Sequence, residues 1–272
     1  KSGVRILEPR FFIIIIIIII KVHLHMYAEE KELEIKFSKN QLMDRVKAMY
    51  KAILPTADGF IIKAMAMIAI YKRLSPSTFV GLMYKQDMSG QEIIDTLLQM
   101  AQKGFMQWDG MTFIVQWEIP PEVQQELDLY QYPMPMVVEP ERITDNQHDG
   151  HYYINSPIML GKGNNTNEDV NLDVINYVNK TRLCIDLDTA EHCNVQWNKP
   201  IDTVAKQHSY DKYVSTAKAM CTVFAGKNIY LTHKYDKRGR VYCQGYYISY
   251  QGTDWNKAVI ELSNKEITLD DI

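Results

Sequence analysis

The spacing of apolar residues predicts that the first third of the chain is helical. Apolar positions recur three and four residues apart over Gln41–Ile53, and an almost continuous apolar run covers Phe60–Leu74, so both segments are expected to form helices. Serine is a favoured helix cap and proline a favoured first helical residue, so Ser75-Pro76 marks a third helix. Ser89 marks the start of a fourth helix for the same reason.

A β-hairpin is predicted over residues 105–117, where an Asp-Gly pair separates two arms rich in aromatic and β-branched residues. Helices followed by a hairpin indicate a winged helix, a common DNA-binding module. Trp108, Asp109, Gly110 and Met111 are expected at the hairpin tip, where an indole could stack on a base. The alternative is an ordinary hairpin whose Trp108 packs on its own domain.

The second half of the chain alternates between helical and extended patterns. Val170–Leu187 is expected to be a helix, and a longer helix begins at Asp202 or Thr203 and ends before Gly226. Residues 229–235 and 241–250 alternate between apolar and polar side chains, as strands do. The whole pattern predicts an α+β fold that is mainly helical and carries β-hairpins.

The N-terminal region contains eight consecutive isoleucines, Ile13–Ile20, in an apolar run too short to span a bilayer. Such a run would be a severe aggregation hazard. We interpret residues 13–20 as placeholders for unidentified side chains and rest no argument on residues before about Val22. No membrane association is expected.

Charge is unevenly distributed along the 272 residues, although the net charge is only −3. Lys199–Arg240 contains nine Lys and Arg against three Asp, a local net charge of +6. This predicts a modest basic region, for which a solvated helix face is the alternative. The four cysteines show no paired spacing that would hold zinc, so no metal site is expected in this chain.

The charged segment Asp-Lys-Arg-Gly-Arg-Val-Tyr at 236–242 connects the two expected strands. Arg238 and Arg240 carry planar guanidinium groups suited to phosphates. Gly239 is expected to remove a side chain where another backbone comes close. Gln-Gly-Thr-Asp follows at 251–254. These residues predict a clamp for a nucleic-acid backbone.

The motif Asp-x-x-Gly-Arg, followed by Val-Tyr and then Gln-Gly-x-Asp, resembles the segment that opens the palm of single-subunit, phage-type RNA polymerases. In that family the segment grips the template and its hybrid beside the active site, and a hairpin like that at 105–117 wedges into DNA at the upstream edge of the bubble. The alternative is a hairpin whose arginines lie in solvent. The resemblance implies that nucleic acid is bound by Asp236, Arg238, Gly239, Arg240, Tyr242, Gln251, Gly252 and Asp254.

The resemblance also implies a division of the chain into four parts. These are a poorly defined N-terminal segment (1–40), a promoter-handling domain (41–167), short thumb-like helices (168–227) and the start of a polymerase palm (228–272). Family members carry two metal-binding aspartates several hundred residues after the motif, whereas this sequence stops at Ile272. No catalytic residue is therefore expected here, and Mg²⁺ would be bound by a partner.

The resemblance thus implies the small subunit of a heterodimeric, DNA-directed RNA polymerase of a bacteriophage, acting in the cytoplasm of an infected bacterial host. The larger subunit would carry the nucleotidyltransferase chemistry, and this chain, inactive alone, would hold the DNA template and the RNA–DNA hybrid. A fragment of a longer polymerase is the alternative within that family. The rival interpretation is a non-enzymatic, winged-helix DNA-binding regulator.

Overall fold

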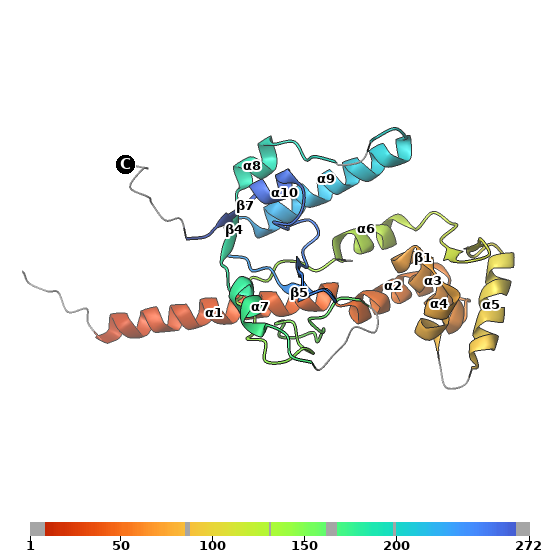
Figure 1. Cartoon of the computed structure of the whole chain (residues 1–272), viewed down its shortest axis with the longest axis horizontal. Helices are drawn as coiled ribbons and strands as arrows, with labels where there is room; N and C mark the ends of the chain where they lie inside the picture. Colours follow the sequence, from red (N-terminus) through yellow and green to blue (C-terminus); the bar gives the residue numbers. More distant parts are fainter. Residues whose placement is uncertain (1–8, 85–87, 131, 162–167, 198–199, 265–272) are drawn as a thin grey trace, which may run out of the picture. The chain divides into compact units, whose positions relative to one another are not determined.

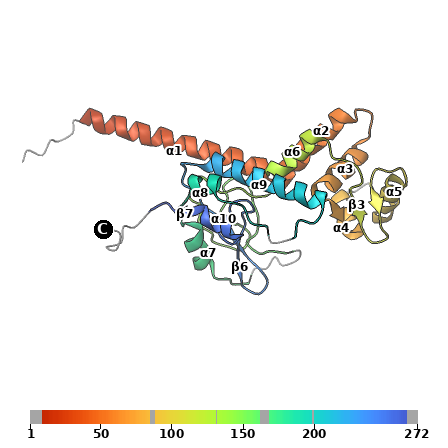
Figure 2. The same cartoon turned by 90° about the horizontal axis from the view of Figure 1, so that it is seen from above.

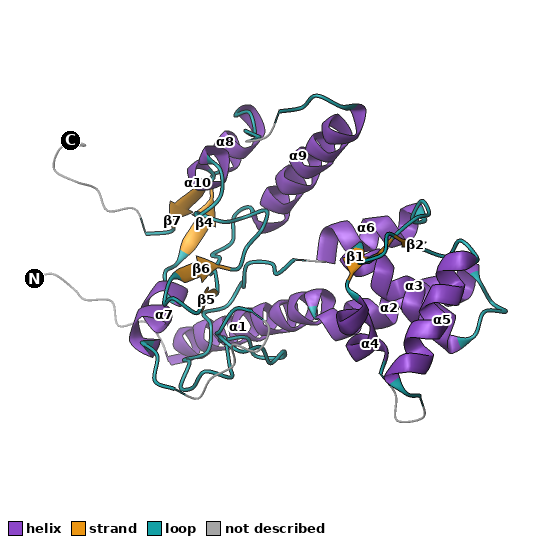
Figure 3. Ribbon diagram, turned by 45° about the vertical axis from the view of Figure 1, so that its right-hand side comes forward, coloured by secondary structure: helices purple, strands orange, loops and turns teal. Residues whose placement is uncertain are grey.

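A computed structural model describes residues 9–84, 88–130, 132–161, 168–197 and 200–264 (Figure 1). The expected N-terminal segment before Pro9 and the expected palm beyond residue 264 lie outside the described residues. Helices and short antiparallel sheets make up the chain, which confirms the α+β prediction (Figure 3). Within the ranges described, no helix has the length and apolar character needed to cross a bilayer.

The chain forms two compact units. One is Lys36–Gln131, and the other combines Lys1–Ile35 with Tyr132–Ile272. This division differs from the expected boundaries after residues 40, 167 and 227, because the N-terminal helix belongs with the second half of the chain.

The unit 36–131 surrounds one apolar core that includes the fully buried Val46, Ile68, Phe79 and Leu97. The predicted helix starts are confirmed where serine side chains cap them: Ser75 accepts a hydrogen bond from the Thr78 backbone, and Ser89 forms a capping box. The elements of this unit are α2 (Lys39–Ile53), α3 (Gly59–Tyr71), β1 (Arg73–Leu74), α4 (Pro76–Met83), α5 (Gly90–Gln102), β2 (Gln107–Trp108), β3 (Phe113–Ile114) and α6 (Pro121–Tyr130).

The order of elements from α3 to β3 is that of a winged helix. β3 pairs with β1 on one side and with β2 on the other, which gives the sheet order β1-β3-β2. Helix α4 lies next to β3 (Figure 2). Phe79 of α4 packs there against Phe113 of β3, with 5.5 Å between the ring centroids. The helix expected over Phe60–Leu74 is too long, because Lys72 adopts a positive φ of 61° and turns the chain into β1.

The second unit interleaves helices with two-stranded sheets. β7 returns from late in the sequence to pair with β4, and β5 pairs with β6. The elements are α1 (Pro9–Phe37), α7 (Leu172–Asn179), β4 (Leu183–Ile185), α8 (Leu187–His192), α9 (Val204–Phe224), β5 (His233–Tyr235), β6 (Val241–Cys243), α10 (Asp254–Ala258) and β7 (Ile260–Leu262).

Two predictions for this unit are wrong in extent. The helix expected over Val170–Leu187 is broken after α7, because Leu183–Ile185 pairs with β7 as a strand. The strand expected over residues 241–250 ends at Cys243. The long helix is confirmed as α9, whose cap is Thr203 and whose end is followed by Gly226 with a positive φ of 73°.

The N-terminal segment is helical from Pro9 onward, in contrast to the expected poorly defined segment. Two buried glutamates fasten α1 to the segment that follows Tyr132. Glu30 accepts a hydrogen bond from the backbone N of Val137 at 2.6 Å. Glu34 accepts hydrogen bonds from three successive backbone N atoms at residues 152–154, at 2.9, 2.6 and 3.2 Å. Burial, together with neighbouring Glu34, raises the pKa of Glu30 to about 8.

Candidate nucleic-acid interface

The charged motif forms the turn of a tight hairpin between β5 and β6. The backbone N of Gly239 donates to the O of Asp236, and the N of Asp236 donates to the O of Arg240, each at 2.9 Å. Gly239 has a φ of 78°, as a three-residue hairpin loop requires at this position. A Cβ on Gly239 would meet no atom of this chain within 4 Å, so within the chain the glycine is required by the backbone conformation. The expected close approach of another backbone remains a prediction.

Asp236 organises the side chains of this hairpin. Its carboxylate accepts hydrogen bonds from the backbone N atoms of Arg238 and Arg240 at 2.9 and 3.0 Å. Its Oδ2 also accepts from Nε of Arg240 at 2.8 Å and from the hydroxyl of Tyr242 at 3.3 Å. These bonds, led by those from Arg240, hold the pKa of Asp236 well below its usual range. The carboxylate therefore stays ionised and fixes the direction of the Arg240 side chain.

Both arginines remain accessible to a ligand. The side chain of Arg238 is 75% exposed and that of Arg240 is 54% exposed. Asp236 holds Arg240 through Nε and Nη2. Residues 236–240 carry three cationic side chains and one carboxylate, a net charge of +2. The hairpin thus presents a positively charged, partly ordered surface that suits a phosphate.

The basic region before the hairpin contributes less surface charge than the sequence indicates. Lys234 is nearly buried and pairs with Asp149 at 3.0 Å. Lys206 pairs with Asp202 at 2.6 Å, and Lys218 donates to the backbone O of Glu191. The cationic surface near the motif is therefore provided mainly by the hairpin.

The second part of the motif folds back onto β6. The side-chain O of Gln251 accepts from the backbone N of Cys243 at 2.8 Å, and its N donates to the backbone O of Val241 at 3.1 Å. A Cβ on Gly252 would lie 2.6 Å from Oδ1 of Asn256, so only glycine fits there. Asp254 lies in the first turn of α10 and pairs with Lys257 at 3.2 Å.

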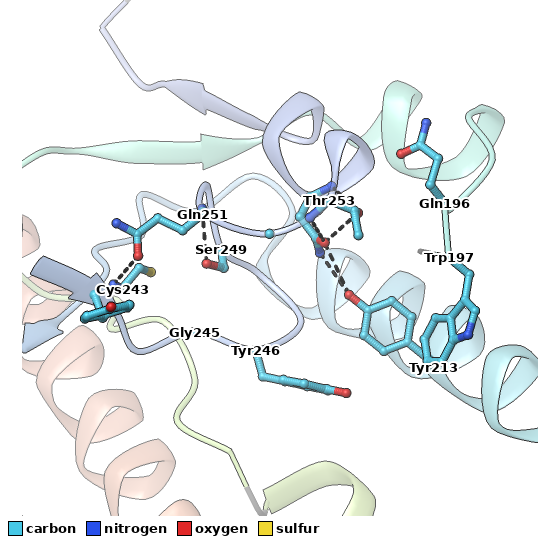
Figure 4. A pocket seen from close by; sticks show the side chains of 12 residues that line it. Gln196, Trp197, Tyr213, Cys243, Gly245, Tyr246, Ser249, Gln251 and Thr253 are labelled. Carbon is cyan, nitrogen blue, oxygen red and sulfur yellow. Dashed lines mark hydrogen bonds between the residues drawn. The ribbon is translucent and has the colours of Figure 1, made fainter. Parts of the chain in front are cut away.

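A cavity of about 430 Å³ lies beside the hairpin, between the chain around β6 and helix α9 (Figure 4). Its volume falls within the range of small-molecule sites, about 300–1,000 Å³. Sequence reasoning identified only Tyr242, Gln251 and Gly252 among the lining residues. The others come from separate parts of the chain: Gln196, Trp197, Tyr213, Cys243, Gly245, Tyr246, Ser249, Thr253 and Asn256.

Aromatic rings form much of the cavity wall. The ring centroid of Tyr213 lies 5.5 Å from that of Trp197 and 5.7 Å from that of Tyr246. Tyr132 stacks on Tyr246 at 4.0 Å. Burial raises the pKa of both Tyr213 and Tyr246, so their phenols stay neutral. The Tyr246–Tyr247 pair is the only hint of this cluster next to the motif, and no local pattern connects it to Trp197.

Buried Asn256 holds the cavity wall in place. Its Oδ1 accepts from the backbone N of Thr253 at 2.9 Å, and its Nδ2 donates to the hydroxyl of Tyr213 at 3.1 Å and to the backbone O of Tyr247 at 2.9 Å. Helix α10, helix α9 and the loop after β6 therefore meet at one side chain.

The hairpin of the other unit is shorter than expected. Its arms are β2 and β3, and Asp109 stabilises the turn by accepting hydrogen bonds from the backbone N atoms of Met111 and Thr112. Trp108 belongs to β2 and packs on Phe113 and the unit's own core, so the prediction that it lies at the tip is wrong. Gly110, with a φ of 91°, and Met111, which is 78% exposed, form the tip.

Within the described ranges, no group of three or more His, Cys, Asp or Glu is placed to hold a metal ion. Comparison of the sequence with protein-family models and with curated proteins finds no match.

Proposed function

We propose that this chain is the small subunit of a heterodimeric, phage-type DNA-directed RNA polymerase that acts in the cytoplasm of an infected bacterial host. It positions the DNA template and the RNA–DNA hybrid, and a larger partner subunit carries the catalytic aspartates and the two Mg²⁺ ions that drive nucleotidyl transfer. This chain contributes positioning and no chemistry of its own.

The observation that carries the proposal is the arrangement of the 236–240 hairpin. The Asp236 carboxylate accepts hydrogen bonds from the backbone N and from Nε of Arg240. These bonds order the guanidinium group, although the Arg240 side chain is still 54% exposed. Ordering a cation before its ligand arrives lowers the entropy lost on binding. The Asp-x-x-Gly-Arg sequence resembles the template-gripping segment of the polymerase family at these same residues.

The experiment is transcription by the reconstituted enzyme. The chain is co-expressed with the polymerase subunit that carries the palm and fingers, and the complex is purified through a tag on either subunit. On a primed RNA–DNA scaffold with nucleoside triphosphates and Mg²⁺, the complex extends the RNA and the isolated small chain does not. Extension by the isolated chain, or an unchanged rate when this chain is left out, would contradict the proposal.

A second candidate function rests on the winged-helix arrangement of the unit 36–131, which suits a duplex-binding regulator. Helix α5 occupies the position that recognition helices take, yet its charged side chains are Glu92 and Asp95. Carboxylates there would face the phosphates of a duplex and weaken binding. A regulator would bind duplex DNA without a partner, so duplex binding by the isolated chain that is abolished by changes in α5 would favour this second function.

A further inference from the structure

We propose that the aromatic cavity beside the hairpin holds one unpaired base of a single-stranded nucleic acid whose backbone lies on the 236–240 hairpin. The inference rests on the proposed function in one respect: both use the 236–240 hairpin as the surface that binds phosphate. It adds a site for the base, formed by Trp197, Tyr213 and Tyr246, that neither the sequence motif nor the resemblance indicates.

Three aromatic side chains from separate segments line the cavity. Trp197 and Tyr213 lie on one side of the cavity, and Tyr246 is seen edge-on beneath Ser249 and Thr253 (Figure 4). Tyr246 is 42% exposed even though Tyr132 stacks on it, so part of the ring remains open to a ligand. Stacking of a base on an aromatic side chain contributes about 1–3 kcal/mol for each base. The neutral phenols place no negative charge next to the nucleic-acid backbone.

Three polar side chains of the cavity already bond to the protein itself. The side chain of Gln251 bonds to the backbone of β6 on both of its polar atoms. Asn256 bonds to Thr253, Tyr213 and Tyr247. The hydroxyl of Ser249 accepts from the backbone N of Gln251. Because these three side chains are engaged, recognition is expected to rest mainly on the aromatic faces, which accept any base.

Two glycines give the loop around the cavity its shape. A Cβ on Gly245 would lie 1.9 Å from the backbone O of Ile248, and a Cβ on Gly252 would clash with Asn256. Larger residues would therefore displace the segments that carry Tyr246 and Thr253.

Tyr242 joins the cavity to the phosphate-binding hairpin. Its ring lines the cavity, its hydroxyl bonds to Asp236, and the guanidinium carbon of Arg240 lies 5.5 Å from its ring centroid. None of the described residues that line the cavity is an Asp or Glu. A base in the cavity and a phosphate at Arg240 are thus compatible with one continuous strand.

The test compares two fluorescent oligomers of equal length: a dodecamer of deoxythymidine and a dodecamer of abasic nucleotides with the same phosphates. Dissociation constants are measured by anisotropy with the full chain. Tyr246→Ala and Trp197→Ala are expected to weaken thymidine binding by about 5- to 100-fold. Both variants should bind the abasic strand like the wild type. Tyr246→Phe keeps the ring and should bind normally, as should Tyr177→Ala, which removes a tyrosine that is 79% exposed on α7.

Equal affinity of the alanine variants and the wild type for thymidine, with native circular dichroism, would overturn the inference. So would equal losses on both oligomers. If a free mononucleotide competes for the site as well as the oligomer does, the ligand is a nucleotide and not a single strand. That result would also contradict the proposal. Arg240→Ala is expected to weaken binding of both oligomers, which separates failure of the cavity from failure of the hairpin.

A second readout uses the unmodified protein and does not depend on folding of a variant. Oligothymidine carrying 5-iodouracil forms photochemical crosslinks to aromatic side chains that stack on it. Crosslinks are expected at Trp197, Tyr213 or Tyr246. Crosslinks that map only to residues outside the cavity would refute the inference.

Discussion

The buried glutamate pair that fastens α1 makes stability depend on pH in a predictable direction. Glu30 is 1% exposed and Glu34 is fully buried, and the proximity of the two carboxyl groups disfavours two negative charges. Glu34 accepts three backbone hydrogen bonds. Burial, together with the neighbouring carboxyl group of Glu34, raises the pKa of Glu30 to about 8, so Glu30 holds a proton in the folded state.

The sign and size of the effect follow from linkage. The pKa of Glu30 is raised from 4.5 to about 8, so between these values the folded chain keeps a proton that the unfolded chain has lost. The contribution of Glu30 to the free energy of unfolding is consequently highest below pH 4.5 and falls as the pH rises toward 8. The slope of this contribution approaches about 1.4 kcal/mol per pH unit, the value for one proton.

Glu30→Gln isolates this contribution. A glutamine keeps a carbonyl O for the backbone N of Val137 and offers an N–H to Glu34, so it imitates the protonated glutamate. The variant should match the wild type at pH 4.5 and exceed its stability by about 2–4 kcal/mol at pH 7.5. Guanidinium unfolding monitored by circular dichroism at pH 4.5, 5.5, 6.5 and 7.5 measures the difference. Glu191→Gln, at an exposed glutamate on α8, is the control.

A stability difference between Glu30→Gln and the wild type that stays constant across this pH range would refute the reasoning. It would show that Glu30 is ionised in the folded state or that the helix is not held by this contact.

Three further changes test the packing around the two hairpins, each by urea unfolding of the full chain. Asn256→Ala leaves the backbone groups that it binds without partners and should cost about 2–4 kcal/mol, whereas no loss would mean that the cavity wall does not depend on it. Gly239→Ala forces an alanine into a positive φ and should cost about 1–2 kcal/mol, and an unchanged stability would contradict the hairpin geometry. Trp108→Ala should lower the free energy of unfolding by about 2 kcal/mol, whereas Met111→Ala should leave it unchanged. The reverse order would contradict the packing of Trp108 on the core.

Local signals in the sequence predicted where helices begin but not how far strands extend. Ser75, Ser89 and Thr203 act through hydrogen bonds within three residues, so their effect is visible in a short window. Leu183 was expected in a helix and lies in a strand, because its partner, β7, comes from much later in the chain. The alternation over residues 241–250 is interrupted at Gly245, where the backbone folds against Ile248.

The candidate site divides along the same lines. The hairpin residues from Asp236 to Tyr242 were predicted together because they are adjacent in sequence and bond to one another. The aromatic cavity could not be predicted, because Trp197, Tyr213 and Tyr246 lie in separate segments of the sequence that only the folded chain brings together. The burial of Glu30 and Glu34 was equally hidden, since a charged residue on a helix is normally solvated.

The central claim is that Arg240 holds a nucleic-acid phosphate during synthesis, and its most direct test is the RNA extension rate of the assembled two-subunit enzyme. Arg240→Ala should lower the rate or the stability of the elongation complex by about ten- to a hundredfold, because a charge-assisted contact is lost. Arg240→Lys should recover only part of that loss, because an ammonium group cannot reproduce the planar two-pronged contact. Arg142→Ala, at an exposed arginine outside the hairpin, should leave the rate unchanged. If the enzyme with Arg240→Ala extends RNA at the wild-type rate, Arg240 is a solvated surface residue and the proposed role of the hairpin is contradicted.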